Sequence, residues 1–580
     1  MSLRRNLSLS GFRRHVLACL FALIAGMLSF APSLVAEVSI GDAYRGVPFF
    51  YQNDEETYLA RMREVSEGHG FASSPFYHEY KTATSIMWPL GEYPYVVVSF
   101  LTRLPLETVV VWSKFFLPAV LFFMVYVLVL RLLRGQEGDG RWPALAGASL
   151  IVLAYDPIFR LGGLELSIWT RPVNPIMGAL ALFGVLLSLE RLLTTKKLGW
   201  AAPIVLLAGL MVWYPFSWAI TLSIIGGLWL ASFFKQRRDT LKILSFVLPM
   251  SVLASLPYAL YLIATTDAEA VGGSAAVKFG ASFTHLPIMN KTLLLATIVF
   301  AIGIVWMRAR KILWSEIVKT NWLVWSGVFL FAGWLVFNQQ IITGRTVWPS
   351  HFVQYTKPLV YLVVVLLAWA LLHTWTRARK ALMGVLIGAS FVNGILWSAS
   401  VPSILEDYRN AQRYEAPITW LRKHAASPCV VLVSERVEYL TERIPAYTSC
   451  DVYAISWVFS GVPEERVQHN FFTRMRLLGV LPEHARSWME EHPHEVRALF
   501  FRDWDDLFAK GTADAWFIET ADRLNKQYAE FYAKDFRMEV TKYRLDYVIS
   551  DGEIPYYVVD ALGIRSEDQA GQFRIYRFQP

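Results

Sequence analysis

Charged residues are scarce in this sequence of 580 residues: only 18% are Asp, Glu, Lys or Arg, whereas 55% are hydrophobic and 15% are aromatic. A water-soluble globular domain has closer to 25% charged residues. The mean hydropathy of +0.37 and repeated apolar runs of membrane-spanning length indicate a polytopic membrane protein. The formal net charge of +8 comes from Lys and Arg in short loops between these runs. It therefore indicates orientation in a bilayer, and because no RNA- or DNA-binding motif occurs, we expect no nucleic-acid partner.

Motifs for metal binding and for familiar soluble catalysis are also missing. The sequence has no CxxC or HExxH motif, and its C-terminal region has no P-loop or nucleophile elbow. Of only three cysteines, Cys19 lies in the first apolar run and Cys429 and Cys450 lie near the C-terminus. An oxidising compartment would permit a disulfide between Cys429 and Cys450, but two cysteines alone leave this pairing open.

Eleven apolar runs predict membrane-spanning helices. They are residues 16–36, 106–130, 143–159, 174–190, 200–213, 216–234, 243–264, 288–306, 322–338, 357–375 and 381–400. Lys and Arg alternate between the connecting loops as the positive-inside rule requires, which predicts a cytoplasmic N-terminus and, with an odd number of spans, a C-terminal segment outside a bacterial-type inner or plasma membrane. The first run also resembles a signal peptide with a cleavage point at SLVAE, but its length favours a retained anchor. The stretch YPYVVVSFLTRLP predicts a short amphipathic helix along the interface.

The expected fold class is thus a polytopic α-helical membrane protein with a C-terminal soluble α/β domain. Residues 1–400 would form the transmembrane domain, including a large first outer loop at 37–105, and residues 401–580 the outer-face domain. In the latter, CVVLVS, LDYVISDG and FRIYRFQ predict strands, and residues 463–479 and 515–533 predict helices. Because no catalytic motif occurs in it, this domain is expected to bind an acceptor or another partner.

Three consecutive acids, Asp54, Glu55 and Glu56, open a predicted helix in the first outer loop. One explanation is local: Asn53 or Asp54 is the N-cap, and the helix dipole favours the two glutamates in the first turn. An apolar stripe follows, formed by Tyr58, Leu59, Met62 and Val65. The other explanation is functional, because a carboxylate at the membrane surface can act as general base on an acceptor hydroxyl while a lipid-linked donor leaves its phosphate in the bilayer interface.

This order of elements, with Asp54-Glu55 in a long outer loop after the first span, resembles the GT-C superfamily of integral membrane glycosyltransferases. There an acid of the first outer loop marks the catalytic site, and the donors are polyprenyl-phosphate or polyprenyl-diphosphate sugars. Asp54-Glu55 looks like the "DE" of protein mannosyltransferases. The resemblance implies hexosyl or pentosyl transfer to a glycan, lipid or protein acceptor on the outer face, with Asp54 as general base and Glu55 as its support. Asp42, nearer to the first span, and Asp156 are alternative acids.

A lipid-phosphate donor needs cations beside the bilayer surface, and the outer loops contain few. The predicted phosphate-binding residues are Arg171, in YDPIFRLGGLELSIWTRPVNP, and Arg345, His351 and Lys357, in NQQIITGRTVWPSHFVQYTK. A solvated hairpin with interfacial aromatic anchors would explain the second segment equally well.

The sequence leaves alternatives open for a metal cofactor and for the function. His69 and His78 share the first loop with Asp54 and are candidate ligands of a divalent metal, Mg²⁺ or Mn²⁺, although they lack a metal-binding spacing. Besides a glycosyltransferase, the protein could be a transporter or flippase of a lipid-linked glycan, or a non-catalytic membrane scaffold that binds a glycan. A transporter often has ionisable residues in mid-membrane, and charges confined mostly to loops favour the transferase.

Overall fold

The computed structural model describes residues 15–51, 54–83, 87–134, 139–155, 166–265, 280–309, 321–434, 438–455, 462–502 and 504–578. Asp156 and Asn53 lie outside these described residues. The chain divides into two compact units. We call residues 1–38, 110–261 and 283–404 the helical unit, and residues 39–109, 262–282 and 405–580 the mixed unit.

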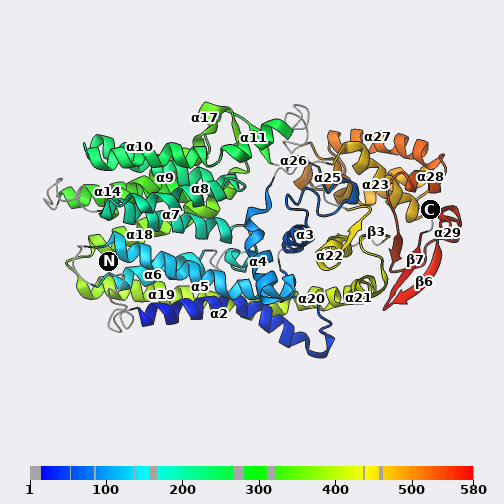
Figure 1. Ribbon diagram of the computed structural model, residues 1–580, viewed down its shortest axis with the longest axis horizontal. Helices are drawn as coiled ribbons and strands as arrows, with labels where there is room; N and C mark the ends of the chain where they lie inside the picture. Colours follow the sequence, from blue (N-terminus) through cyan, green and yellow to red (C-terminus); the bar gives the residue numbers. More distant parts are fainter. Residues whose placement is uncertain are drawn as a thin grey trace. The chain divides into compact units, whose positions relative to one another are not determined.

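Long apolar helices build the helical unit (Figure 1). Its helices, some of which extend past the unit's ends, are α2 (Val16–Ile40), α5 (Leu106–Leu132), α6 (Arg141–Leu153), α7 (Ile176–Thr195), α8 (Ala201–Leu210), α9 (Pro215–Phe234), α10 (Arg238–Leu253), α11 (Leu256–Thr265), α14 (Lys291–Ala309), α16 (Asn321–Asn338), α17 (Gln340–Thr343), α18 (Val353–Leu371) and α19 (Thr376–Ser400). Short 3₁₀ turns are η4 (Ile168–Thr170), η5 (Leu198–Trp200), η6 (Pro349–Phe352) and η7 (Val401–Ile404), and β1 (Ala281–Phe283) and β2 (Arg345–Val347) are short strands.

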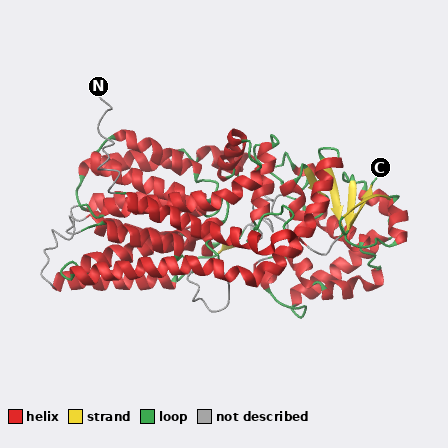
Figure 2. Ribbon diagram, turned by 90° about the horizontal axis from the view of Figure 1, so that it is seen from below, coloured by secondary structure: helices red, strands yellow, loops and turns green. Residues whose placement is uncertain are grey.

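The predicted spans are confirmed as apolar helices. Within the described residues, nine helical segments are long and apolar enough to cross a membrane, and the shorter apolar segments Arg141–Leu153 and Leu198–Leu210 coincide with the two remaining predicted spans. Helix α6 packs against α18 and α19, and α9 packs against α10 and α16. Figure 2 shows the long helices of this unit running side by side. Helices pair most of their backbone N–H and C=O groups within the segment itself, as a bilayer requires.

The mixed unit combines the first loop with the C-terminal region. From the first loop come η1 (Gly41–Ala43), α3 (Glu55–Ser66), η2 (His78–Tyr80), η3 (Pro89–Gly91) and α4 (Tyr93–Thr102). From the C-terminal region come helices α20 (Leu405–Ala411), α21 (Glu415–His424), α22 (Glu438–Tyr447), α23 (Glu464–Leu477), α24 (Ala485–Glu491), α25 (Pro493–Phe500), α26 (Trp504–Phe508), α27 (Ala515–Tyr532), α28 (Phe536–Val540) and α29 (Tyr556–Leu562), and the 3₁₀ turns η8 (Gln412–Tyr414) and η9 (Pro482–His484).

A five-stranded sheet lies in the mixed unit, in the order β4-β3-β5-β7-β6. Its strands are β3 (Cys429–Val433), β4 (Cys450–Val452), β5 (Tyr547–Ser550), β6 (Arg565–Ala570) and β7 (Phe573–Arg577). Strands β4, β3 and β5 are parallel, and β7 pairs antiparallel with β5 and β6. The three predicted strands are therefore confirmed as β3, β5 and β7, and the two predicted helices as α23 and α27.

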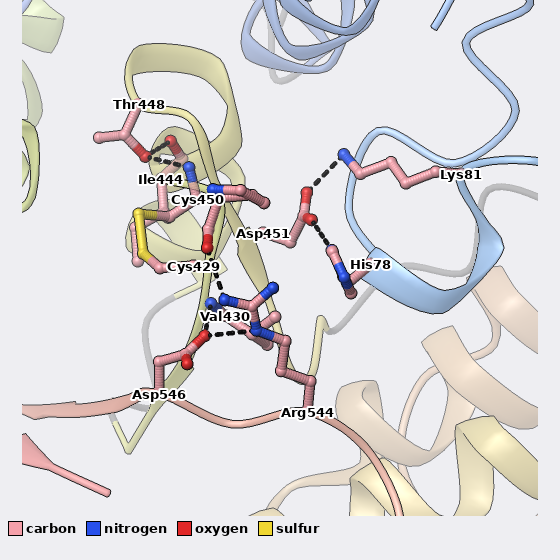
Figure 3. Close-up of a disulfide and its surroundings, with 11 residues drawn as sticks. His78, Lys81, Cys429, Val430, Ile444, Thr448, Cys450, Asp451, Arg544 and Asp546 are labelled. Carbon is pink, nitrogen blue, oxygen red and sulfur yellow. Dashed lines mark hydrogen bonds and ion pairs between the residues drawn. A yellow bond between two sulfur atoms is a disulfide. The ribbon is translucent and has the colours of Figure 1, made fainter. Parts of the chain in front are cut away.

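The Cys429–Cys450 disulfide, which the sequence left open, joins the first residues of β3 and β4 (Figure 3). The two residues are register partners in the parallel pair, with their Cα atoms 4.4 Å apart. The disulfide fixes β4, the edge strand of the sheet, to the strand beside it.

Helix α4 is the helix predicted from YPYVVVSFLTRLP, and its apolar side chains are exposed: Phe100 is 83% and Leu101 73% accessible. Such exposure suits a helix that lies on a membrane surface, as predicted.

Candidate functional site

The acid pair of the first loop stands at the N-terminus of α3. Asp54 occupies the N-cap position and is half-buried, and its carbonyl oxygen accepts a hydrogen bond from the Tyr58 amide at 3.0 Å. Within the described first turn, residues 54–57, the Asp54 carboxylate makes no capping hydrogen bond. The local explanation of this acid as a side-chain cap is thus not supported, although the helix dipole still stabilises negative charge at this end.

Glu55 supports the loop rather than the helix end. Its side chain is only 1% exposed, and its Oε1 accepts a hydrogen bond from the Tyr51 amide at 3.2 Å. The contact holds Tyr51 against the first turn of α3. Behind it, the predicted apolar stripe is confirmed, since Tyr58, Leu59, Met62 and Val65 are all buried.

Glu56, the third acid, is paired with the C-terminal region. Arg443 of α22 donates through Nη2 to Glu56 Oε1 at 3.2 Å, and both side chains are buried. Burial raises the pKa of the Glu56 carboxyl, and the Arg443 guanidinium opposes this rise. The Tyr447 hydroxyl is buried near the same carboxylates, and burial raises its pKa well above the usual value. The Arg443–Glu56 pair therefore lies where water is largely excluded.

Three of the four predicted phosphate-binding residues come together in the helical unit. Lys357 of α18 places its Nζ 4.3 Å from the centre of the Tyr155 ring. Tyr155 packs edge-on against Trp169, with the ring centres 5.3 Å apart. Trp169 lies in η4, and Arg171 is the residue that follows η4. The Trp169 indole donates to the Ile151 carbonyl at 2.6 Å, which anchors η4 to the end of α6. Aromatic packing thus brings the segments that carry Lys357 and Arg171 together.

His351 joins this group from η6. Its ring stacks on Phe216 at 5.0 Å and lies 5.2 Å from the Trp348 ring. The Arg171 guanidinium is close enough to repel a positive charge on this imidazole. Arg171 and Lys357, placed among aromatic rings in a mostly apolar unit, suit a phosphate, because a low-dielectric setting strengthens each charged contact. The His351 imidazole can add a hydrogen bond. We call Arg171, Lys357 and the adjacent His351 the cation cluster, after the charges of Arg171 and Lys357.

Arg345, the fourth predicted residue, lies elsewhere on the surface of the helical unit. It is exposed on β2, and its guanidinium lies 5.7 Å over the Phe283 ring. Its carbonyl accepts a hydrogen bond from the Gln339 side chain at 2.8 Å. The solvated-hairpin alternative fits this residue, whereas the buried surroundings of the cation cluster fit a binding role.

Asp42 is the alternative acid whose setting can be compared with that of Asp54. Asp42 is exposed in η1, directly after α2, and Asp156 lies outside the described residues. A catalytic role of Asp42 stays a prediction, and the exposed setting of its carboxylate adds no support to it.

The two candidate metal ligands, His69 and His78, have different neighbours in the first loop. His69 lies with Glu64 and Glu67, whose ligand atoms are all within 4.8 Å of one another. His78 instead contacts Asp451 at 3.1 Å. Carboxylate and imidazole donors fit Mn²⁺ better than Mg²⁺, but the Lys81 ammonium also contacts Glu64 and opposes a dication there. Glu64 is ten residues from Asp54, about 15 Å along the helix, so a metal at this group would not reach Asp54.

Two buried charged residues, Lys114 and Arg443, are not among the predicted site residues. Lys114, in VVVWSKFFLP, is 3% exposed in α5, which is long and apolar enough to span a membrane. It is the one charged residue between positions 108 and 130, a signal that could have been found, since an ionisable residue inside a span is a functional candidate. Arg443 gave no local signal, because its partner is 387 positions away.

No family model and no curated protein sequence matches this chain. Among solved structures it is similar to the archaeal oligosaccharyltransferase AglB from Archaeoglobus fulgidus, solved in complex with an inhibitory peptide and a dolichol-phosphate, at 13% identity and a TM-score of 0.45 over 93% of this chain and 70% of that one. It is also similar to ArnT from Cupriavidus metallidurans, at 12% identity and a TM-score of 0.46 over 98% of both chains.

A third similar structure is the arabinofuranosyltransferase AftD from Mycobacteria, at 12% identity and a TM-score of 0.49 over 98% of this chain and 40% of that one. All three neighbours are GT-C glycosyltransferases, the superfamily that the sequence resembles. Scores of this size carry no argument about activity or individual residues, so the function of this chain has to be inferred from its own side chains.

Proposed function

We propose that the protein is a membrane glycosyltransferase that moves a sugar from a polyprenyl-phosphate carrier to an acceptor on the outer face. The observation that carries this proposal is the cation cluster. Its residues Arg171, His351 and Lys357 lie among aromatic rings, in a unit whose helices are long and apolar enough to span a membrane. Such a site suits the phosphate of a lipid whose hydrocarbon chain stays in the bilayer.

The reaction needs a base as well as a phosphate site, and Asp54 has the properties of one. It stands at a helix N-terminus, half-buried, and within residues 54–57 its carboxylate is not used as a helix cap. In the proposed reaction Asp54 accepts the proton of the acceptor hydroxyl as that oxygen bonds to the anomeric carbon. The bond between the anomeric carbon and the phosphate oxygen breaks, the electron pair stays on the phosphate, and Arg171 and Lys357 stabilise the charge that develops there. Direct displacement inverts the anomeric configuration.

No step of this reaction requires the residues near His69 and His78. If a divalent metal is used, Glu64, Glu67 and His69 are the described residues that could hold one, and it would stabilise that end of α3. A metal role in transfer remains a prediction.

The test uses the purified full chain in nanodiscs with undecaprenyl-phosphate linked to radiolabelled hexoses or pentoses, offered together with membrane glycolipid acceptors. The proposal predicts covalent transfer of label to an acceptor, with release of undecaprenyl phosphate. Asp54→Asn should lower kcat by about 100- to 10,000-fold while the protein stays folded, and full activity of this variant would overturn the assignment of the base.

A second candidate function is a transporter or flippase of a lipid-linked glycan. Lys114 favours it, because a buried lysine in a candidate span is an expected feature of a translocation pathway. Proteoliposomes separate the two functions. Movement of the labelled lipid across the bilayer with no covalent product would support transport, and transfer without movement would support the enzyme.

A further inference from the structure

Helix α22 of the C-terminal region packs directly on helix α3 of the first loop. The Arg443–Glu56 pair lies at this contact, with side chains only 9% and 8% exposed. The Arg443 guanidinium also lies 5.1 Å over the Tyr414 ring. A pair removed from water leaves a buried charge unsatisfied whenever either member moves away, so it resists displacement more strongly than a surface pair does.

A second contact holds the same face of α3 further along. Arg63 donates through Nε to the Ala446 carbonyl of α22 at 3.0 Å. Glu56 and Arg63 are seven residues apart, which is two helical turns, and they therefore project from the same side of α3. Helix α22 thus fixes both the position and the rotation of α3.

The rest of the loop is attached to the edge of the sheet. The Val452 amide of β4 donates to the Phe76 carbonyl at 2.9 Å. Next to it, the Asp451 carboxylate lies between Lys81 and His78, both of the first loop (Figure 3). The first loop thus packs on the C-terminal region at two places: α3 contacts α22, and residues 76–81 contact β4.

We propose that the C-terminal region positions the acid pair of the first loop, and that Arg443 is its positioning residue. The inference rests on the proposed function, because it gives Asp54 the role of base. Arg443 contacts Glu56, two residues from Asp54, at the turn where the helix begins. Any rotation or fraying of this turn displaces the Asp54 carboxylate, and a displacement of about 1 Å costs on the order of 100-fold in rate.

The chain provides a matched control for Arg443. Arg474 of α23 pairs with Glu495 of α25 at 3.3 Å, with side chains 8% and 3% exposed, so burial and geometry resemble those of the Arg443–Glu56 pair. Both members of the control pair belong to the C-terminal region. Arg443→Gln and Arg474→Gln should therefore remove comparable buried pairs, and only the first should release α3.

Two measurements on the full chain test the proposal. In the transfer assay, Arg443→Gln should lower kcat by about 10- to 100-fold and leave KM for the undecaprenyl-phosphate sugar within about twofold, while Arg474→Gln leaves kcat within about twofold. Hydrogen exchange should show faster exchange of the Tyr58 amide, which donates to the Asp54 carbonyl, in Arg443→Gln and not in Arg474→Gln. Arg443→Lys, which keeps the charge, should restore part of kcat.

The outcomes separate this inference from the proposed function. If Asp54→Asn is inactive but Arg443→Gln and Arg474→Gln have equal kcat and equal exchange at Tyr58, the positioning role is wrong and the base assignment stands. If Asp54→Asn is fully active, both fail. If Arg443→Gln raises KM for the donor instead of lowering kcat, Arg443 acts on donor binding and the positioning role is also overturned.

Discussion

Lys81 offers the sharpest stability prediction, because its ammonium contacts two buried carboxylates, Glu64 and Asp451. The side chains are 11%, 4% and 5% exposed, respectively, and the Lys81–Asp451 distance is 2.5 Å. Burial raises the pKa of both acids, and Lys81 opposes the rise. Lys81→Met leaves the two carboxylates without this ammonium. Breaking a buried pair in this way costs about 3–5 kcal/mol.

The cost should depend on pH, with a sign that follows from the direction of these shifts. In the variant, at least one of Glu64 and Asp451 will hold a proton in the folded state at pH values where the unfolded chain has released it. Each such proton makes stability fall by about 1.4 kcal/mol per pH unit as the pH rises. The stability is present below the unfolded-state pKa and is lost as the pH rises through the folded-state pKa. The native Lys81 has a raised pKa and stays charged throughout this range.

The assay is native-state hydrogen exchange of the Val452 amide, which donates to Phe76 where the loop meets the sheet. Between pH 5 and pH 7, the deficit of Lys81→Met relative to the native chain should grow by up to about 2.7 kcal/mol for one retained proton. Lys542→Met is the control, since Lys542 is 51% exposed beside Glu539 and should cost at most about 1 kcal/mol at either pH. A deficit for Lys81→Met that is independent of pH, or as small as that of Lys542→Met, would refute this reasoning.

Two further predictions concern the cation cluster and the disulfide. Arg171→Gln should raise KM for the undecaprenyl-phosphate sugar by about 10-fold or more, because a charge-assisted phosphate contact is worth about 1.5–3 kcal/mol. Arg345→Gln, the control, should change this KM by less than about twofold. Equal effects of the two variants in steady-state kinetics would contradict a phosphate-binding role of the cation cluster. Thiol titration of the denatured, unreduced chain should find only Cys19 of the three cysteines, and Cys429→Ser with Cys450→Ser should destabilise the mixed unit by about 3 kcal/mol in exchange at β4. Three reactive thiols before reduction would show that the disulfide does not form.

Much of the fold could be predicted from the sequence because the bilayer imposes a simple rule on composition. Each of the eleven apolar runs overlaps one or two of the described helices. Nine of these runs match helical segments long enough to cross the hydrocarbon layer, for which about 20 apolar residues are needed. The strands β3, β5 and β7 were likewise visible as short runs of β-branched and aromatic residues. The strand β4, only three residues long, left too short a pattern to read.

The site could be predicted less well, because its pairings are not local in sequence. The position of Asp54 at the start of a helix followed from the acids and the apolar stripe, but which side chain the carboxylate contacts depends on its conformation in the fold. The partner of Glu56 is 387 positions distant, and no periodicity relates two such residues. The grouping of Arg171 with Lys357 depends on Tyr155 and Trp169, whose packing only the folded chain defines.

The central claim is that Asp54 is the base of a sugar transfer. Its most direct test compares Asp54→Asn with Asp42→Asn in the nanodisc transfer assay, with melting temperature as the check on folding. The proposed mechanism predicts that Asp54→Asn lowers kcat by about 100- to 10,000-fold, the usual contribution of a general base, and that Asp42→Asn stays within about threefold of the native chain. Native activity in a folded Asp54→Asn protein, or loss of activity only in Asp42→Asn, would contradict it.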